Sequence, residues 1–173
     1  MDDQWFRNAL VEAHKHQREH LYWLIEGIDE EHMLKNVTDE EFTSSIIKIL
    51  QHIGNAETYW FHKNGNEIGP PIKKLDSRIV LERLKENTEK IENKVMNCDS
   101  EELKIQTGMN KQTPSIAWCV LRTYQHGLYH AGQIAKIRRI EGAKELAYHR
   151  DELWSLAVDS VIEILERFTN ESH

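Results

Sequence analysis

One segment of the chain reads Tyr124-Gln125-His126-Gly127-Leu128-Tyr129-His130-Ala131-Gly132-Gln133-Ile134. Counting from Cys119 by threes and fours gives positions 119, 123, 126, 130, 134 and 137, which share one α-helix face and end at the apolar Ile134 and Ile137. His126 and His130 fall on the same face, and residues four apart on a helix are neighbours. Two imidazoles at this spacing can reach one metal ion. The segment therefore predicts a core helix that carries two candidate metal ligands.

Glycines flank the two histidines, although each glycine weakens a helix by about 1 kcal/mol. Gly127 and Gly132 therefore indicate the close approach of a neighbouring helix or of a ligand. A histidine on a helix face is more often a hydrogen-bonded core or boundary residue than a metal ligand. With ten histidines in the chain, pairs four residues apart also arise by chance, and His16 and His20 form a second such pair. The spacing alone leaves both interpretations open.

The same periodicity predicts five helices in all. They span about residues 5–28, 38–64, 78–96, 113–142 and 151–168. We expect the second to begin at a capping box, Thr38 to Glu41, with Phe42 on its buried face, and the fourth to begin at Thr113 and Pro114. No run of alternating β-branched residues indicates a sheet. The predicted fold class is therefore all-α, a four-helix bundle with an additional C-terminal helix.

Length and composition indicate one globular domain, residues 1–173, with 39% hydrophobic and 29% charged residues. The formal net charge of −7 argues against a nucleic-acid partner, which requires a basic surface. Two cysteines are too few for a secreted disulfide scaffold. The acidic start, Met1 to Asp3, does not resemble a signal peptide, and no apolar run is long enough to span a membrane. We therefore expect a cytoplasmic protein with no membrane partner.

His52 is the candidate third ligand. It lies next to Ile53 and three residues after Ile49, so it borders the buried face of its helix. Three histidines form a neutral ligand set, which leaves a divalent ion most of its charge. Such an ion can lower the pKa of a bound water to about 7 in the favourable zinc case. Periodicity does not show whether these three side chains converge.

Four further residues are candidates for lining a pocket. Gln17 and His20 interrupt the apolar face of the first helix. They either line the pocket, if that helix packs over the metal, or lie at the edge of the bundle in contact with solvent. Gln133 is a candidate for orienting a ligand. Tyr129 either lines the pocket or packs between helices.

The remaining polar residues have less support. We expect Glu57 to pair with a basic side chain rather than with a ligand imidazole, Cys119 to be a buried apolar residue, and Cys98 to lie in a loop. Arg138 and Arg139 either hold an anionic substrate or complement the helix dipole. The other histidines are expected at the surface: His14, His16, His32, His62, His149 and His173.

Two motifs resemble those of the DinB/YfiT-like superfamily. The motif of the last bundle helix is His126-x-x-x-His130-x-Gly132-Gln133-Ile134, and that of the second helix is Leu50-Gln51-His52-Ile53-x-x-x-Glu57-x-x-Trp60. Their order and separation also match, and the resemblance covers about residues 3–140. It implies a four-helix bundle in which His52, His126 and His130 hold one divalent ion, often nickel, zinc or iron. It also implies a homodimer, and it leaves the C-terminal helix outside the shared core.

The activities of that superfamily are mostly reactions of low-molecular-weight thiols. They include thiol S-transferases that use bacillithiol or mycothiol, a thiol-dependent maleylpyruvate isomerase, and metal-dependent hydrolases. The resemblance therefore implies an enzyme that activates a thiol or water for attack on a small-molecule electrophile. The alternative is a non-catalytic metal-binding or dimerisation module. The absence of a recognisable general base and the additional C-terminal helix favour this alternative.

Overall fold

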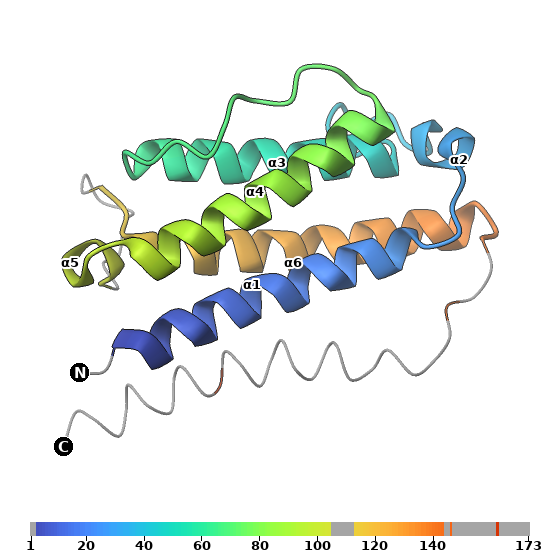
Figure 1. Cartoon of the computed structure of the whole chain (residues 1–173). Helices are drawn as coiled ribbons and strands as arrows, with labels where there is room; N and C mark the ends of the chain where they lie inside the picture. Colours follow the sequence, from blue (N-terminus) through green and yellow to red (C-terminus); the bar gives the residue numbers. More distant parts are fainter. Residues whose placement is uncertain (1–2, 105–112, 144–145, 147–161, 163–173) are drawn as a thin grey trace.

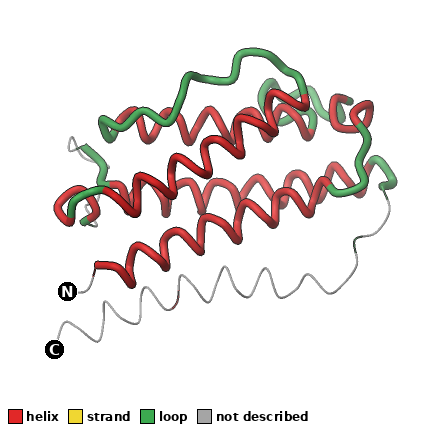
Figure 2. Tube along the Cα trace, viewed as in Figure 1, coloured by secondary structure: helices red, strands yellow, loops and turns green. Residues whose placement is uncertain are grey.

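Four long helices make up most of the chain that the computed structural model describes, which is residues 3–104, 113–143, 146 and 162. They are α1 (Asp3–Ile25), α3 (Ile46–Lys63), α4 (Ser77–Asn97) and α6 (Ile116–Ile140), with the short helices α2 (Glu30–Leu34) and α5 (Ser100–Leu103) between them. No described residue lies in a strand, which confirms the all-helical prediction (Figure 2). The helix predicted over residues 151–168 lies outside the described residues, apart from Ile162.

The second predicted helix begins later than its capping box indicates. The N-cap of α3 is Ser45, whose side chain accepts the backbone N–H of Lys48. Residues before it form a loop that is closed by a 2.7 Å hydrogen bond from the Val37 N–H to the Ser44 carbonyl. Phe42 lies in this loop with 59% of its surface exposed, so the prediction that it is buried was wrong. The local capping signal at Thr38 is overridden by the contacts that close the loop.

Two other helix ends also differ from the prediction. Ser115, not Thr113, is the N-cap of α6, and its side chain accepts the backbone N–H of Trp118 at 3.1 Å. At the other end of the fold, α1 stops at Ile25, three residues earlier than expected. Gly27 follows with a φ of 72°, the left-handed conformation in which glycine commonly ends a helix.

The long helices pack around a common interior. α1 contacts α6 and α4, and α3 contacts the same two helices from the other side. Figure 1 shows α1 and α6 running in one direction and α3 and α4 in the other, with α2 and α5 at opposite ends. Within the described part of the chain, no helix is long and apolar enough to cross a membrane.

The interior is divided along its length into an apolar cluster, a polar zone and a second apolar cluster. One cluster contains Leu10, Phe61, Ile91 and Ile116, and the other contains Leu21, Ile53, Leu84 and Ile134. Each long helix therefore passes from apolar to polar and back to apolar side chains. We call the zone between the clusters the polar belt, and its members are His14, Gln17, Arg18, His20, His52, Glu57, Asn87, Thr123, His126 and His130.

A buried ion pair occupies one side of the polar belt. The Arg18 guanidinium of α1 donates to the Glu57 carboxylate of α3, and the two side chains are 3% and 1% exposed. Asn87 of α4 donates to the second oxygen of Glu57 at 3.1 Å, and Arg18 also donates to the Thr88 hydroxyl at 2.9 Å. Glu57 thus pairs with an arginine, as predicted, and this network joins three helices.

Candidate metal centre

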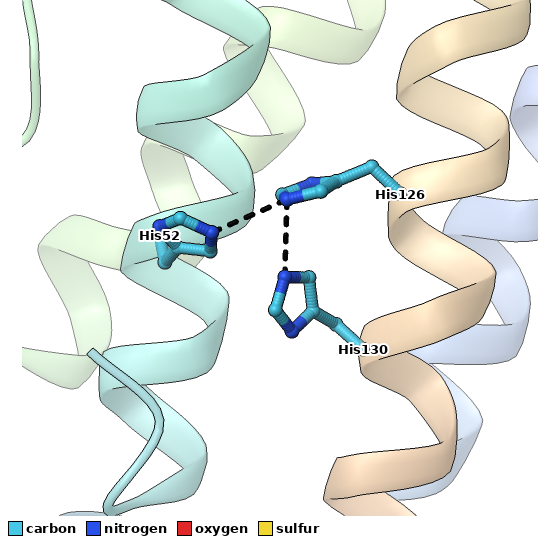
Figure 3. Close-up of side chains that lie close together, drawn as sticks. All are labelled: His52, His126 and His130. Carbon is cyan, nitrogen blue, oxygen red and sulfur yellow. Dashed lines mark hydrogen bonds between the residues drawn. The ribbon is translucent and has the colours of Figure 1, made fainter. Parts of the chain in front are cut away.

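Three histidines of the polar belt converge between α3 and α6. His52 projects from α3 toward His126 and His130, which lie one turn apart on α6 (Figure 3). The Nε2 atom of His126 lies 3.2 Å from that of His52 and 3.0 Å from that of His130. One nitrogen from each ring lies within 4.8 Å of the other two. The convergence that helix periodicity could not establish is therefore present in the folded chain.

Packing on both sides fixes the position of these rings. His52 borders the buried face of α3, where Ile49 and Ile53 are fully buried. The ring of Trp60, two turns further along α3, meets the edge of the His126 ring at a centroid distance of 4.9 Å. The three histidines are half-buried or buried, so they are partly shielded from solvent while remaining reachable from one side.

The nitrogen arrangement fits a cation better than a set of hydrogen bonds. His126 Nε2 faces two other ring nitrogens, yet a neutral imidazole nitrogen is either one donor or one acceptor. At most one of the two short contacts can then be a hydrogen bond. Three nitrogens bound to one tetrahedral ion would be separated by roughly 3.3 Å, given metal–nitrogen bonds near 2.0–2.1 Å. The donor set therefore fits a divalent transition metal.

The local electrostatics keep the three rings neutral. Burial, followed by the proximity of His130, His52 and Arg122, lowers the pKa of His126 to about 3. Burial is also the main cause that lowers the pKa of His52 and of His130. A histidine must be neutral to bind a metal. The rings are consequently ready to act as ligands at neutral pH without losing a proton.

Gln133 contacts the outer nitrogen of one candidate ligand. Its Oε1 atom lies 2.6 Å from His130 Nδ1, so the Nδ1–H donates to the amide and the Nε2 lone pair points toward the other two histidines. This is the arrangement expected of a residue that orients a ligand. His126 has no equivalent neighbour, because its buried Nδ1 has no hydrogen-bond partner among the described residues.

A cavity of about 580 Å³ opens onto the three histidines. One wall is the loop from Glu40 to Thr43, and the other is the face of α6 that carries Arg122, Tyr129 and Gln133. Tyr129 is 67% exposed and its ring centroid lies 5.0 Å from that of His130, so it lines the cavity rather than packing between helices. The cavity has room for a small molecule beside the histidines.

Gln17 and His20 lie elsewhere. Both are almost fully buried, at 1% and 2% exposure, and neither lines this cavity or contacts solvent at an edge. The reason is that α1 packs against both α4 and α6 and so buries a wider face than one apolar stripe. A Cβ added at Gly127 would lie 1.9 Å from Gln17 Nε2, which confirms close helix approach there. Gly132 has nothing within 4 Å of that position.

Other candidate residues are also placed differently from the sequence-based expectations. His14 is fully buried in the polar belt rather than at the surface, for the same packing reason. The pair His16 and His20 forms no metal-ligand group with other described residues. Arg138 is buried and donates to the backbone carbonyls of Leu24 and Glu26, so it caps α1 instead of facing a substrate. His149 and His173 lie outside the described residues.

The cysteines are placed as expected. Cys119 is buried, and burial raises the pKa of its thiol to about 12, which makes it a poor nucleophile. Cys98 is the half-buried C-cap of α4.

Two parts of the cavity were not recognised in the sequence. Arg122 precedes His126 by four residues, so the helical spacing that linked the histidines extends to it as well. The Glu40–Thr43 loop had no such signal, because its local sequence is typical of a helix start.

Comparisons with known proteins found no relative of this chain. No model of a known protein family matches the chain, no curated protein matches it, and no solved structure matches it. The candidate centre is therefore defined by its own geometry.

Proposed function

We propose that His52, His126 and His130 hold one divalent transition-metal ion, with nickel, zinc and iron as the candidates. The observation that carries the proposal is the convergence of three neutral ring nitrogens at the wall of a cavity. Gln133 supports it by fixing the orientation of His130, as hydrogen-bonded neighbours of metal-binding histidines commonly do. A neutral ligand set leaves the ion strongly electrophilic.

We further propose that the protein is a metal-dependent enzyme of the DinB/YfiT-like type, a thiol S-transferase or a hydrolase. A bound divalent ion supplies Lewis acidity, which lowers the pKa of a thiol or of water. The chain supplies the walls that bring a small electrophile close to that group. Glu40 and Glu41 contribute carboxylates on the far wall, where a proton released at the site can be accepted. The reaction class is thus attack of a low-molecular-weight thiol, such as bacillithiol, or of water on a small electrophile.

Metal analysis of protein purified without an affinity tag tests the centre. We expect about one transition-metal ion per chain, falling below about 0.1 in His130→Ala, because two nitrogens bind far more weakly than three. His62→Ala is the matched control, since it removes an exposed histidine of α3. Gln133→Leu should keep the ligands but weaken metal affinity by about 10–100-fold. Wild-type protein that takes up no transition metal after soaking would refute the centre.

A thiol-transfer screen tests the catalytic part. Several low-molecular-weight thiols would be combined with a chromogenic electrophile, before and after chelation. Turnover that disappears on chelation and returns with metal supports the enzyme. Stoichiometric metal with no turnover for any thiol, and no hydrolysis, would favour the alternative of a non-catalytic metal-binding or dimerisation module.

Three statements stay predictions alongside this proposal. The resemblance to the DinB/YfiT-like superfamily predicts that the four long helices form a four-helix bundle, with an additional C-terminal helix. It also predicts a homodimer, which light scattering at micromolar protein would measure. The third is the cytoplasmic location that the sequence predicts.

A further inference from the structure

Arg122 lines the cavity but is not a candidate metal ligand. Arg122, His126 and His130 follow one another at intervals of four on α6, so they form a single row along the cavity wall. The Arg122 guanidinium is always charged and lines the same cavity as the three histidines. It therefore places a permanent cation beside the candidate metal centre.

Aromatic and amide contacts hold this arginine in place. The Arg122 guanidinium lies over the Trp60 ring, 4.6 Å from its centroid, and Nη1 donates to Gln125 Oε1 at 3.1 Å. Trp60 also contacts His126, so the arginine and the histidine are positioned by the same ring. Stacking leaves the edge of a guanidinium, where its N–H donors lie, open to an anion.

No carboxylate neutralises this cation within the described part of the chain. None lies within 4.0 Å of Arg122, whereas most other arginines of the described helices pair with an acid or cap backbone carbonyls. The acidic groups that face the cavity, Glu40 and Glu41, come from the opposite wall, and Glu40 is engaged by the Thr43 hydroxyl. The positive charge of Arg122 is thus available to a ligand.

We infer that Arg122 is an anion-binding residue and that this cavity takes a substrate with a carboxylate at one end and the reacting thiol or oxygen at the other. This inference rests on the proposed metal centre, because the three histidines define where the reacting end lies. Adjacent members of the row are four residues apart, which is about 6 Å along α6. A ligand with about two or three carbons between its two ends can span that distance.

A matched pair of thiols tests the inference. Mercaptopropionate and its neutral amide, mercaptopropionamide, differ only in the charged end. Their dissociation constants for metal-loaded protein would be measured by calorimetry at low ionic strength, where charge pairing is least screened. We expect wild-type protein to bind the acid at least about tenfold more tightly than the amide, as charge-assisted hydrogen bonds allow.

Variants assign the preference to one residue. Arg122→Gln should reduce the preference for the acid to below about threefold, and Arg122→Lys should retain part of it, because lysine keeps the charge without the planar fork. Arg139→Gln is the control, since it removes one positive charge from an exposed position at the end of the same helix. Metal content and thermal unfolding would be recorded for every variant.

Each outcome bears on one proposal. Metal-loaded wild-type protein that binds acid and amide equally, or binds no acid below about 10 mM, overturns the Arg122 inference and leaves the metal centre standing. An acid preference that survives in Arg122→Gln also overturns it. Failure of wild-type protein to take up metal overturns the metal centre and, with it, this inference. If Arg122→Gln fails to fold, the wild-type comparison and the Arg122→Lys value still decide.

Discussion

Replacing Glu57 with glutamine should destabilise the fold strongly, because it removes the charge that balances Arg18. Arg18 is 3% exposed at its side chain and cannot turn toward water without leaving the polar belt. The amide oxygen of the glutamine and the Thr88 hydroxyl can each accept a hydrogen bond from Arg18, but neither carries the compensating charge. Breaking a buried ion pair from one side costs about 3–5 kcal/mol. That is a large share of the about 5–15 kcal/mol by which a domain is stable.

Urea unfolding followed by circular dichroism measures this loss. The free energy of unfolding is extrapolated to zero urea, and an unchanged slope shows that both variants unfold from equally compact states. Glu19→Gln is the control, because it makes the same substitution at an exposed position of α1. We expect the control to change stability by less than about 0.5 kcal/mol.

The double variant Arg18→Met/Glu57→Leu separates charge from packing. It removes both charges at once, and Asn87 keeps its bond to the Gly54 carbonyl. Replacing a buried pair with apolar residues of similar size is often neutral or stabilising. We therefore expect the double variant to be more stable than Glu57→Gln. A loss below about 1 kcal/mol in Glu57→Gln, or a double variant as unstable as the sum of its single changes, would refute the reasoning.

Two further predictions concern pH and helix approach. Burial, followed by the charge of Arg18, lowers the pKa of His14 to about 3 in the folded state. As the pH drops, His14 therefore becomes protonated in the unfolded chain before it does so in the folded protein. The free energy of unfolding consequently falls as the pH drops from about 6.5 toward 3. At about pH 5 this costs about 2 kcal/mol, and His14→Leu should flatten that part of the pH profile of urea unfolding; an unchanged profile would contradict it. Gly127→Ala should lower stability by about 1–3 kcal/mol, because its methyl group would overlap Gln17. Gly132→Ala, with open space at that position, should raise stability by up to about 1 kcal/mol; equal thermal shifts in the two variants would count against the described helix contact.

Helix periodicity predicted the long helices well and their ends poorly. Ile116, Ile134 and Ile137 are buried as expected, since apolar spacing reflects which face of a helix is removed from water. Helix starts depend on which of several possible N-caps the rest of the fold accepts. Ser45 is used and Thr38 is not, because the segment between them folds into the loop that lines the cavity.

The candidate site was predictable in part for a similar reason. His126 and His130 share one helix, so their proximity follows from a spacing of four. His52 lies on another helix, and its distance from them depends on how α3 and α6 pack, which one sequence does not determine. The polar residues of α1 show the same limit, because their burial results from contacts with two neighbouring helices.

The polar belt between two apolar clusters has a consequence for how the site responds to distant change. His52 reaches its partners only if α3 keeps its axial register against α6, and a slip of one residue would displace it by about 1.5 Å. The ion-pair network of the belt ties α3 to α1 and α4, through Arg18, Glu57 and Asn87, and not directly to α6. The register is therefore held by the apolar clusters at either end. A substitution that weakens packing at Phe61 or Ile134 would therefore displace the candidate ligands, although neither residue is itself a ligand. Metal affinity would then depend on the packing of both apolar clusters.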